Sequence, residues 1–169
     1  MKIRYANLND IRDIVEVYVG CGPDSGVWYK GFGDERREAS YGELSLFEKV
    51  MNGGSWMSVE TCAVHINDML LRGHHPIVAE IDNKVIGEIE VFIGEEYLLF
   101  GKDLHISVLY VHPKYQGQGI GSALMRHVIN LAEGKGCDCC SVWGGDFYRR
   151  FGFEHYFDRK SFKAKTRAS

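Results

Sequence analysis

A glycine-rich segment in the second half of the chain has the composition of an anion-binding loop. The residues from His112 to Gly121 read HPKYQGQGIG and lie between an apolar run and an amphipathic run. Glycine leaves the backbone open to close approach by a ligand, and the free amides at a helix N-terminus, with the helix dipole behind them, favour phosphate or pyrophosphate. The segment therefore predicts a binding site for a phosphate-bearing ligand.

Two familiar phosphate-binding loops fit these residues poorly. The dinucleotide fingerprint places G-x-G-x-x-G after the first strand of a βαβ unit, whereas Gly117 and Gly119 are followed by Ser122 and lie far down the chain. The nucleotide-triphosphate loop requires a lysine before its final Ser or Thr, and here Gly121 directly precedes Ser122. A nucleotide-binding module and a glycine-rich turn without a ligand remain alternative interpretations.

Periodicity predicts the elements that would hold this loop. Residues 104–111 are nearly all apolar, as in a central strand covered on both faces, and residues 119–133 carry apolar side chains at helical spacing. The loop is therefore expected between a buried strand and the N-terminus of a helix. Three shorter elements are expected after that helix: a strand over 138–143, a helix over 146–151 and a strand over 153–157.

The first half of the chain is predicted to be mainly helical and to end in a hairpin. A capping box from Ser40 to Glu43 opens a helix that runs to Met51. The hairpin joins 77–81 to 85–93, with Val85, Ile89 and Val91 on one face. The other elements are a strand over 2–6, a helix capped by Asn7 or Asn9, an aromatic-bearing loop through Gly33, a helix over 59–70, and a loop at His74 and His75.

Two motifs in this order resemble those of the GNAT superfamily of N-acyltransferases. Residues 116–121, QGQGIG, are similar to that family's Q/R-x-x-G-x-G/A signature, and residues 109–113, LYVHP, look like its usual lead-in. Residues 147–153, FYRRFGF, resemble the family's F-Y-x-x-x-G-F element. The resemblance extends over residues 77–157 and over the first strand and helix, whereas residues 21–73 are longer than in a minimal family member.

The resemblance implies an acetyl-CoA-dependent N-acetyltransferase with a single α/β domain over residues 1–169. Its sheet would be mixed and mostly antiparallel, with six or seven strands flanked by helices, and splayed near Val111 to admit the cosubstrate. Residues 104–157 would form the acetyl-CoA-binding half, and residues 21–73 would form the wall on the acceptor side. The implied acetyl-CoA-binding residues are Leu109, Tyr110, Val111, Gln116, Gly117, Gln118, Gly119, Ile120, Gly121 and Ser122.

Aminolysis of a thioester requires both a proton acceptor and a proton donor. An alkylammonium ion has a pKa of about 10.4 and must lose a proton before attack, and the departing thiolate gains from an acid. Tyr148 matches the family position for that acid. Glu90, whose strand also carries Glu88 on the same face, and His105 are candidate bases that would act through water, because Ser107 stands where family members often carry a carboxylate.

The lengthened region carries aromatic residues with two interpretations. Trp28, Tyr29, Phe32 and Trp56 line an acceptor pocket in one interpretation and belong to the core in the other. The acceptor itself stays open: a small-molecule amine, a protein N-terminus or a lysine side chain. A non-catalytic acyl-CoA-binding or sensing module on the same fold is the alternative function, and the choice between a monomer and a homodimer is left open.

Composition favours a globular cytoplasmic protein with neither a metal nor a nucleic-acid or membrane partner. Hydrophobic residues make up 45% of the 169 residues, and the net charge is only −3. The five cysteines are an odd number, and three of them, Cys137, Cys139 and Cys140, are crowded together. Such spacing suits free thiols better than disulfides or a zinc site. No apolar leader or bilayer-spanning run is found in the sequence, and the basic stretch from Arg159 to Arg167 is expected to be solvated.

Overall fold

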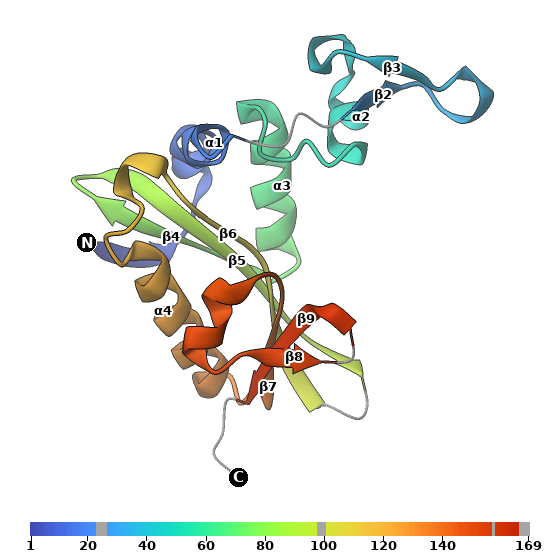
Figure 1. Cartoon of the computed structure of the whole chain (residues 1–169). Helices are drawn as coiled ribbons and strands as arrows, with labels where there is room; N and C mark the ends of the chain where they lie inside the picture. Colours follow the sequence, from blue (N-terminus) through green and yellow to red (C-terminus); the bar gives the residue numbers. More distant parts are fainter. Residues whose placement is uncertain (23–26, 98–100, 157, 166–169) are drawn as a thin grey trace.

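The computed structural model describes residues 1–22, 27–97, 101–156 and 158–165 and forms a seven-stranded sheet with helices on both faces (Figure 1). The strand order is β1-β4-β5-β6-β7-β9-β8. Only the β6–β7 pair is parallel among the pairs described, which confirms the predicted mixed, mostly antiparallel sheet. The strands are β1 (Lys2–Tyr5), β4 (His75–Ile81), β5 (Lys84–Tyr97), β6 (Gly101–Val111), β7 (Cys139–Trp143), β8 (Glu154–Tyr156) and β9 (Asp158–Lys165).

The sheet opens between β6 and β7. The two strands pair only from Asp103, opposite Cys139, to Ile106, opposite Val142. On the other edge of β6, the register with β5 shifts between Glu90 and Val91, so that Ser107 is an extra residue in the ladder. Because a bulge bends its strand, the second half of β6 diverges from β7 and leaves an opening.

Helices cover the two faces of the sheet unequally. α4 (Ile120–Gly134) packs on one face through a large apolar cluster that includes Leu124, Ile89 and Ile106. α1 (Ile11–Gly20) and α3 (Val59–Leu71) cover the other face through a smaller cluster. Figure 1 shows α4 on the opposite side of the strands from α1 and α3.

The prediction that Val85, Ile89 and Val91 share one face is wrong for Val85. Val85 packs in the cluster under α1 and α3, whereas Ile89 and Val91 pack in the cluster under α4. The cause is a register shift between Ala79 and Glu80 in the partner strand β4, which reverses the alternation of β5 at this point. β5 is also buried on both faces over residues 85–91, whereas β6, which we expected to be covered on both sides, exposes Ser107.

Residues 28–51 form an arm that projects from the body (Figure 1). The expected aromatic loop is instead a small antiparallel pair, β2 (Trp28–Lys30) and β3 (Arg37–Ala39). The expected helix from Ser40 is also divided: a 3-10 turn, η3 (Tyr41–Glu43), precedes α2 (Leu46–Met51). The division arises because Ser45 forms a second capping box with Glu48 and starts the helix again.

The remaining elements follow the predicted order with some corrections. His75 begins β4 and is not in a loop, and η5 (Asp146–Phe151) is a 3-10 helix. Most of the basic stretch from Arg159 to Arg167 lies in β9, which pairs with both β7 and β8. Residues 166 and 167, and Phe157 at the end of the strand expected over 153–157, lie outside the described residues. The other 3-10 turns are η1 (Leu8–Asp10), η2 (Gly33–Glu35) and η4 (Pro113–Tyr115).

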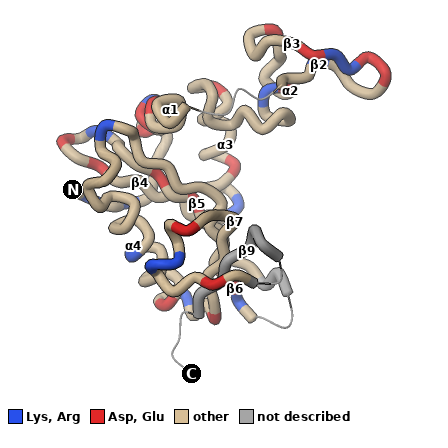
Figure 2. Tube along the Cα trace, in the orientation of Figure 1, with Lys and Arg blue, Asp and Glu red and all other residues tan. Residues whose placement is uncertain are grey.

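The distribution of charged residues and the burial of the cysteines are typical of a globular domain. Figure 2 shows basic and acidic residues intermingled along the described chain, including on the arm. Cys137, Cys139 and Cys140 are buried and are not joined in disulfides, as predicted. Within the described residues, no helix is both long enough and apolar enough to cross a membrane.

Candidate functional site

The glycine loop presents the N-terminus of α4 without a side-chain cap. Gly119 is the N-cap residue, with φ of 83° and ψ of 3°, and Gly117 has φ of 74°. These left-handed conformations favour glycine over residues with a Cβ atom. A Cβ atom added at Gly117 or Gly119 would meet no other atom within 4 Å, so the space beside both backbones is free. The first amides of α4 are therefore available to an anionic ligand.

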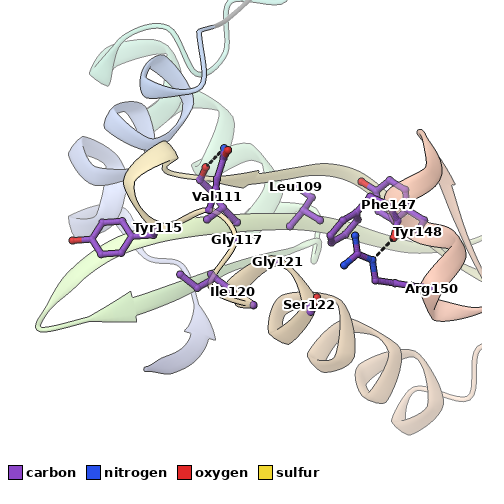
Figure 3. Close-up of a pocket in the computed structure, with 12 residues that line it drawn as sticks. Leu109, Val111, Tyr115, Gly117, Ile120, Gly121, Ser122, Phe147, Tyr148 and Arg150 are labelled. Atoms are coloured by element: carbon purple, nitrogen blue, oxygen red, sulfur yellow. Dashed lines mark hydrogen bonds between the residues drawn. The ribbon is translucent and has the colours of Figure 1, made fainter.

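A cavity of about 540 Å³ lies against this loop (Figure 3). Tyr115 lies at one end of the view, and Phe147, Tyr148 and Arg150 lie at the other. The opening between β6 and β7 supplies the cavity wall beside the loop, because Leu109 projects into it from β6. The complete lining is Leu109, Val111, Tyr115, Gln116, Gly117, Gly119, Ile120, Gly121, Ser122, Phe147, Tyr148 and Arg150.

The structure brings together most of the predicted acetyl-CoA-binding residues and separates two of them. Tyr110 packs edge-on against Tyr18 of α1, with ring centroids 5.0 Å apart, so its side chain lies on the opposite face of the sheet from the α4 cluster. Gln118 donates from its side-chain amide to the carbonyl oxygen of Lys114 at 3.1 Å. The side chains of Tyr110 and Gln118 therefore do not line the cavity.

Two side chains hold the end of β6 in place. Gln116 donates from Nε2 to the carbonyl oxygen of Val111 at 2.9 Å, and Cys21 donates from Sγ to the same oxygen at 3.3 Å. The glutamine of the signature motif thus has a structural partner within the described chain. Cys21 was not predicted from the sequence, because only the fold brings the end of α1 beside the end of β6.

Tyr148 lines the cavity from η5. Its ring packs against Phe147 and Phe153, at centroid distances of 5.3 Å and 5.9 Å. Burial raises the pKa of Tyr148, so its phenol stays protonated at neutral pH and can act as a proton donor. Gly144 makes room for the ring, because a Cβ atom added there would lie 2.4 Å from Cε2 of Tyr148.

Glu90 is held by two residues on the α1 and α3 face of the sheet. Trp56 donates from Nε1 to Oε1 of Glu90 at 2.9 Å, and Nε2 of His65 lies 3.0 Å from both carboxyl oxygens. The rings of Trp56 and His65 meet edge-on, with centroids 4.8 Å apart. Sequence analysis did not identify His65, although its position in α3 next to buried Ile66 is compatible with an inward-facing side chain.

Glu88 lies beside Glu90 and is completely buried. Its two carboxyl oxygens have no hydrogen-bond partner among the described residues. Burial, and then the neighbouring charge of Glu90, raise the pKa of Glu88 well above its ordinary value. The pair therefore holds one neutral carboxyl at Glu88 and one carboxylate at Glu90, which the two ring N–H groups of Trp56 and His65 can satisfy.

His105, the other candidate base, belongs to a different polar group. Its Nδ1 lies 2.8 Å from Oγ of Ser141, and Ser141 donates to the buried carboxyl group of Asp103. Its ring packs against Phe92 at a centroid distance of 4.9 Å. Ser141, a hydrogen-bond partner of His105, thus comes from β7, on the paired side of the opening.

The aromatic residues of the lengthened region divide into two groups. Trp56 reaches Glu90, but Trp28 packs against Tyr41 within the arm. Tyr29 and Phe32 line a second cavity of about 310 Å³, which the arm forms together with the adjoining Asn52. The predicted acceptor pocket therefore retains Trp56 as its only member beside the carboxyl pair, among the four aromatic residues proposed.

Comparison with known proteins identifies the type of domain. Residues 72–155 match the family model described as an acetyltransferase (GNAT) domain. Thialysine N-epsilon-acetyltransferase of Sus scrofa is 36% identical over 70 residues, which cover 37% of this chain and 41% of that protein. The corresponding protein of Mus musculus is 34% identical over 70 residues, again covering 37% and 41% of the two chains. The chain thus matches well under half the length of these curated relatives.

Solved structures match over nearly the whole chain. A GNAT family acetyltransferase from Brucella melitensis, in complex with acetyl-CoA, superposes with a TM-score of 0.61 at 22% identity, covering 99% of this chain and 88% of that one. The PaiA N-acetyltransferase from Thermoplasma acidophilum, in complex with coenzyme A, gives a TM-score of 0.64 at 19% identity, covering 97% and 98%. These likenesses show a shared fold.

Proposed function

Because the chain carries a GNAT acetyltransferase domain, we propose that it transfers the acetyl group of acetyl-CoA to a primary amine. The observation that carries this proposal is the position of Tyr148 in one cavity with the uncapped N-terminus of α4. An anion-binding loop and a protonated phenol in one cavity suit a cosubstrate that carries a pyrophosphate at one end and a thioester at the other.

The chemistry of the cavity residues supports acetyl-CoA as the cosubstrate. Gly117 and Gly119 leave their backbones open, as close approach by a pyrophosphate requires. Leu109 and Val111, on the diverging part of β6, would flank the pantetheine arm. Arg150 is exposed at the end of the cavity near Tyr148 and adds a positive charge there.

The chemistry proposed for the site balances one amine, one thioester and one released proton. The amine begins as an ammonium ion, loses a proton, and its nitrogen forms the C–N bond as the C–S bond breaks. Tyr148 donates a proton to the leaving thiolate and regains one from the amine nitrogen through water. Glu90 or His105, acting through water, takes the first proton and returns it to solvent.

The acceptor is proposed to be an alkylammonium compound. The curated relatives are named for thialysine, whose side chain ends in a primary amine. The carboxylate of Glu90, beside the rings of Trp56 and His65, supports this choice, because carboxylates and aromatic faces both attract cations. Lysine side chains and protein N-termini are acceptors of the same chemical class.

The experiment is an acceptor screen that measures free thiol released from acetyl-CoA. Thialysine, lysine, spermidine and a peptide with a free N-terminus are the first acceptors, and thermal unfolding with coenzyme A, ATP and NAD is measured in parallel. We expect thiol release with at least one amine, and a higher melting temperature with coenzyme A than with ATP or NAD. Binding of coenzyme A without release for any amine would favour the acyl-CoA-sensing alternative instead.

A further inference from the structure

One histidine, His65, contacts the carboxyl pair of Glu88 and Glu90 on the α1 and α3 face, and it has not yet been given a role. His65 is bound through Nε2 to both oxygens of Glu90, at 3.0 Å each. Its side chain is 24% exposed, whereas that of Glu90 is 1% exposed. A substrate can therefore reach the imidazole of His65 more readily than the carboxylate behind it.

The hydrogen bonds around Glu90 determine which atoms can take a proton. Trp56 Nε1 can only donate, so Glu90 accepts from it at Oε1. With Nε2–H of His65 also donating to Glu90, the second ring nitrogen of His65, Nδ1, carries the free lone pair. A histidine held by a carboxylate in this way has the arrangement of a base and its orienting group.

The position of this pair relative to the opening of the sheet suits the proposed reaction. Glu90 stands opposite Val108 in the ladder, and Ser107 at the bulge donates to the carbonyl oxygen of Glu90 at 3.2 Å. Val108 precedes Leu109, which lines the cavity. The cavity and the Glu90–His65 pair thus lie at the same stretch of β6 but on opposite faces of the sheet, the cavity beside α4 and the pair beside α3, so an amine would have to enter the opening between β6 and β7 to meet both.

We propose that His65 is the proton acceptor for the amine and that Glu90 is the residue that positions it. This inference rests on the proposed acetyl transfer and deepens it by naming the base. The proton passes from the ammonium nitrogen to Nδ1 of His65 and then to solvent, and the neutral amine attacks the thioester carbonyl. Glu90 stabilises the imidazolium while it carries the proton, and Tyr148 protonates the leaving thiolate as before.

The other ionisable groups around the pair stay neutral at working pH. Glu88 is neutral for the reasons given above, and burial raises the pKa of Cys62 and raises that of Tyr110 to about 12. Tyr18 of α1 packs against both Trp56 and Tyr110. Glu88, Cys62 and Tyr110 therefore add no charge beside the hydrogen-bonded pair of Glu90 and His65.

The test compares His65→Gln with His74→Gln, using acetyl-CoA and thialysine or whichever screened amine gives the highest turnover. Glutamine at position 65 keeps a donor for Glu90 but has no lone pair of comparable basicity. We expect His65→Gln to lower kcat at neutral pH roughly 10²-fold or more, with unchanged affinity for coenzyme A. His74, a half-buried histidine just after α3, is the matched control and should retain wild-type turnover.

The pH profile separates a proton acceptor from a structural histidine. If His65 takes the proton of a bound ammonium ion, wild-type kcat/KM rises with pH and levels off once the imidazole is neutral. The His65→Gln variant lacks this proton acceptor and reacts only with the fraction of the amine that is already neutral. Its kcat/KM should therefore keep rising about tenfold per pH unit toward the amine pKa of about 10.4. Glu90→Gln should lower kcat while leaving the affinity for coenzyme A in place.

Each outcome decides one of the two proposals. A folded His65→Gln variant within twofold of wild type, or one with the wild-type plateau, overturns the role of His65 and leaves acetyl transfer standing. Loss of turnover in His105→Gln with retention in His65→Gln would assign the base to His105. A wild-type chain that releases no thiol with any amine overturns acetyl transfer, and the role of His65 falls with it.

Discussion

The protonation of Glu88 leads to a quantitative prediction about stability. Glu88→Gln keeps the shape of the neutral carboxyl group but removes its ability to ionise. In the unfolded chain this carboxyl titrates near 4.5, whereas burial and the charge of Glu90 raise the pKa of Glu88 in the folded protein. Between these two values the folded state keeps a proton that the unfolded state has released.

The sign of the effect follows from proton linkage. A group whose pKa is raised on folding contributes stability that is fully present below the unfolded pKa and is lost as pH rises toward the folded pKa. The free energy of unfolding of the wild type should therefore fall by up to about 1.4 kcal/mol per pH unit through this one group. For a domain of this size, that loss corresponds to a decrease in melting temperature of about 3 to 6 °C per pH unit.

Thermal unfolding from about pH 5 to pH 7 measures this effect as a difference between variants. We expect the difference in melting temperature, Glu88→Gln minus wild type, to increase steadily with pH. The size of this difference at the lowest pH does not affect the test. Glu133→Gln, at an exposed position on α4, is the control and should follow the wild-type curve. Parallel curves for Glu88→Gln and wild type over this range would refute the conclusion that Glu88 is buried as a neutral acid.

Three further predictions concern the cavity. Tyr148→Phe should lower kcat and kcat/KM together by roughly 10²- to 10⁴-fold without changing coenzyme A affinity, and steady-state kinetics with calorimetric binding would contradict this if turnover stayed within twofold. Gly144→Ala should lower kcat in the same assay, because its Cβ atom would displace the Tyr148 ring from its place 2.4 Å away; a wild-type kcat would mean that the ring position is not critical. Gly119→Val should weaken coenzyme A binding sharply, since it places a side chain beside the α4 amides, and should cost about 1–2 kcal/mol of stability because φ is 83° there. An unchanged dissociation constant in folded Gly119→Val would place the pyrophosphate elsewhere.

The sequence by itself determined the half of the chain where local signals and motifs coincide. The glycine loop from Gln116 to Gly121 needs left-handed backbone at Gly119, and the helix after it has a strong apolar period, so both could be read from adjacent residues. The same holds for the buried strand before the loop. The mixed, mostly antiparallel character of the sheet followed from the family resemblance, whereas the order of its strands came only from the structure, since periodicity does not report which strands pair.

The arm and the last strand show where local signals mislead. Each of the two capping boxes at Ser40 and Ser45 is a valid helix start, and only the structure shows that the first opens a single 3-10 turn. The basic C-terminal stretch has the charge of a solvated tail, yet its backbone fills the gap between β7 and β8. Pairing partners far away in the sequence decided this, and a local charge pattern does not report them.

Only the tertiary structure decided the environment of the candidate base. The sequence showed that Glu88 and Glu90 share a face, but not that α3 brings His65 within 3.0 Å of Glu90 while Glu88 receives no hydrogen bond from the described residues. Two such carboxyl groups look alike in a sequence. Burial and hydrogen-bond partners set which one keeps its proton, and both depend on the packing of segments that lie 25 residues apart or more, as for His65 and Glu90.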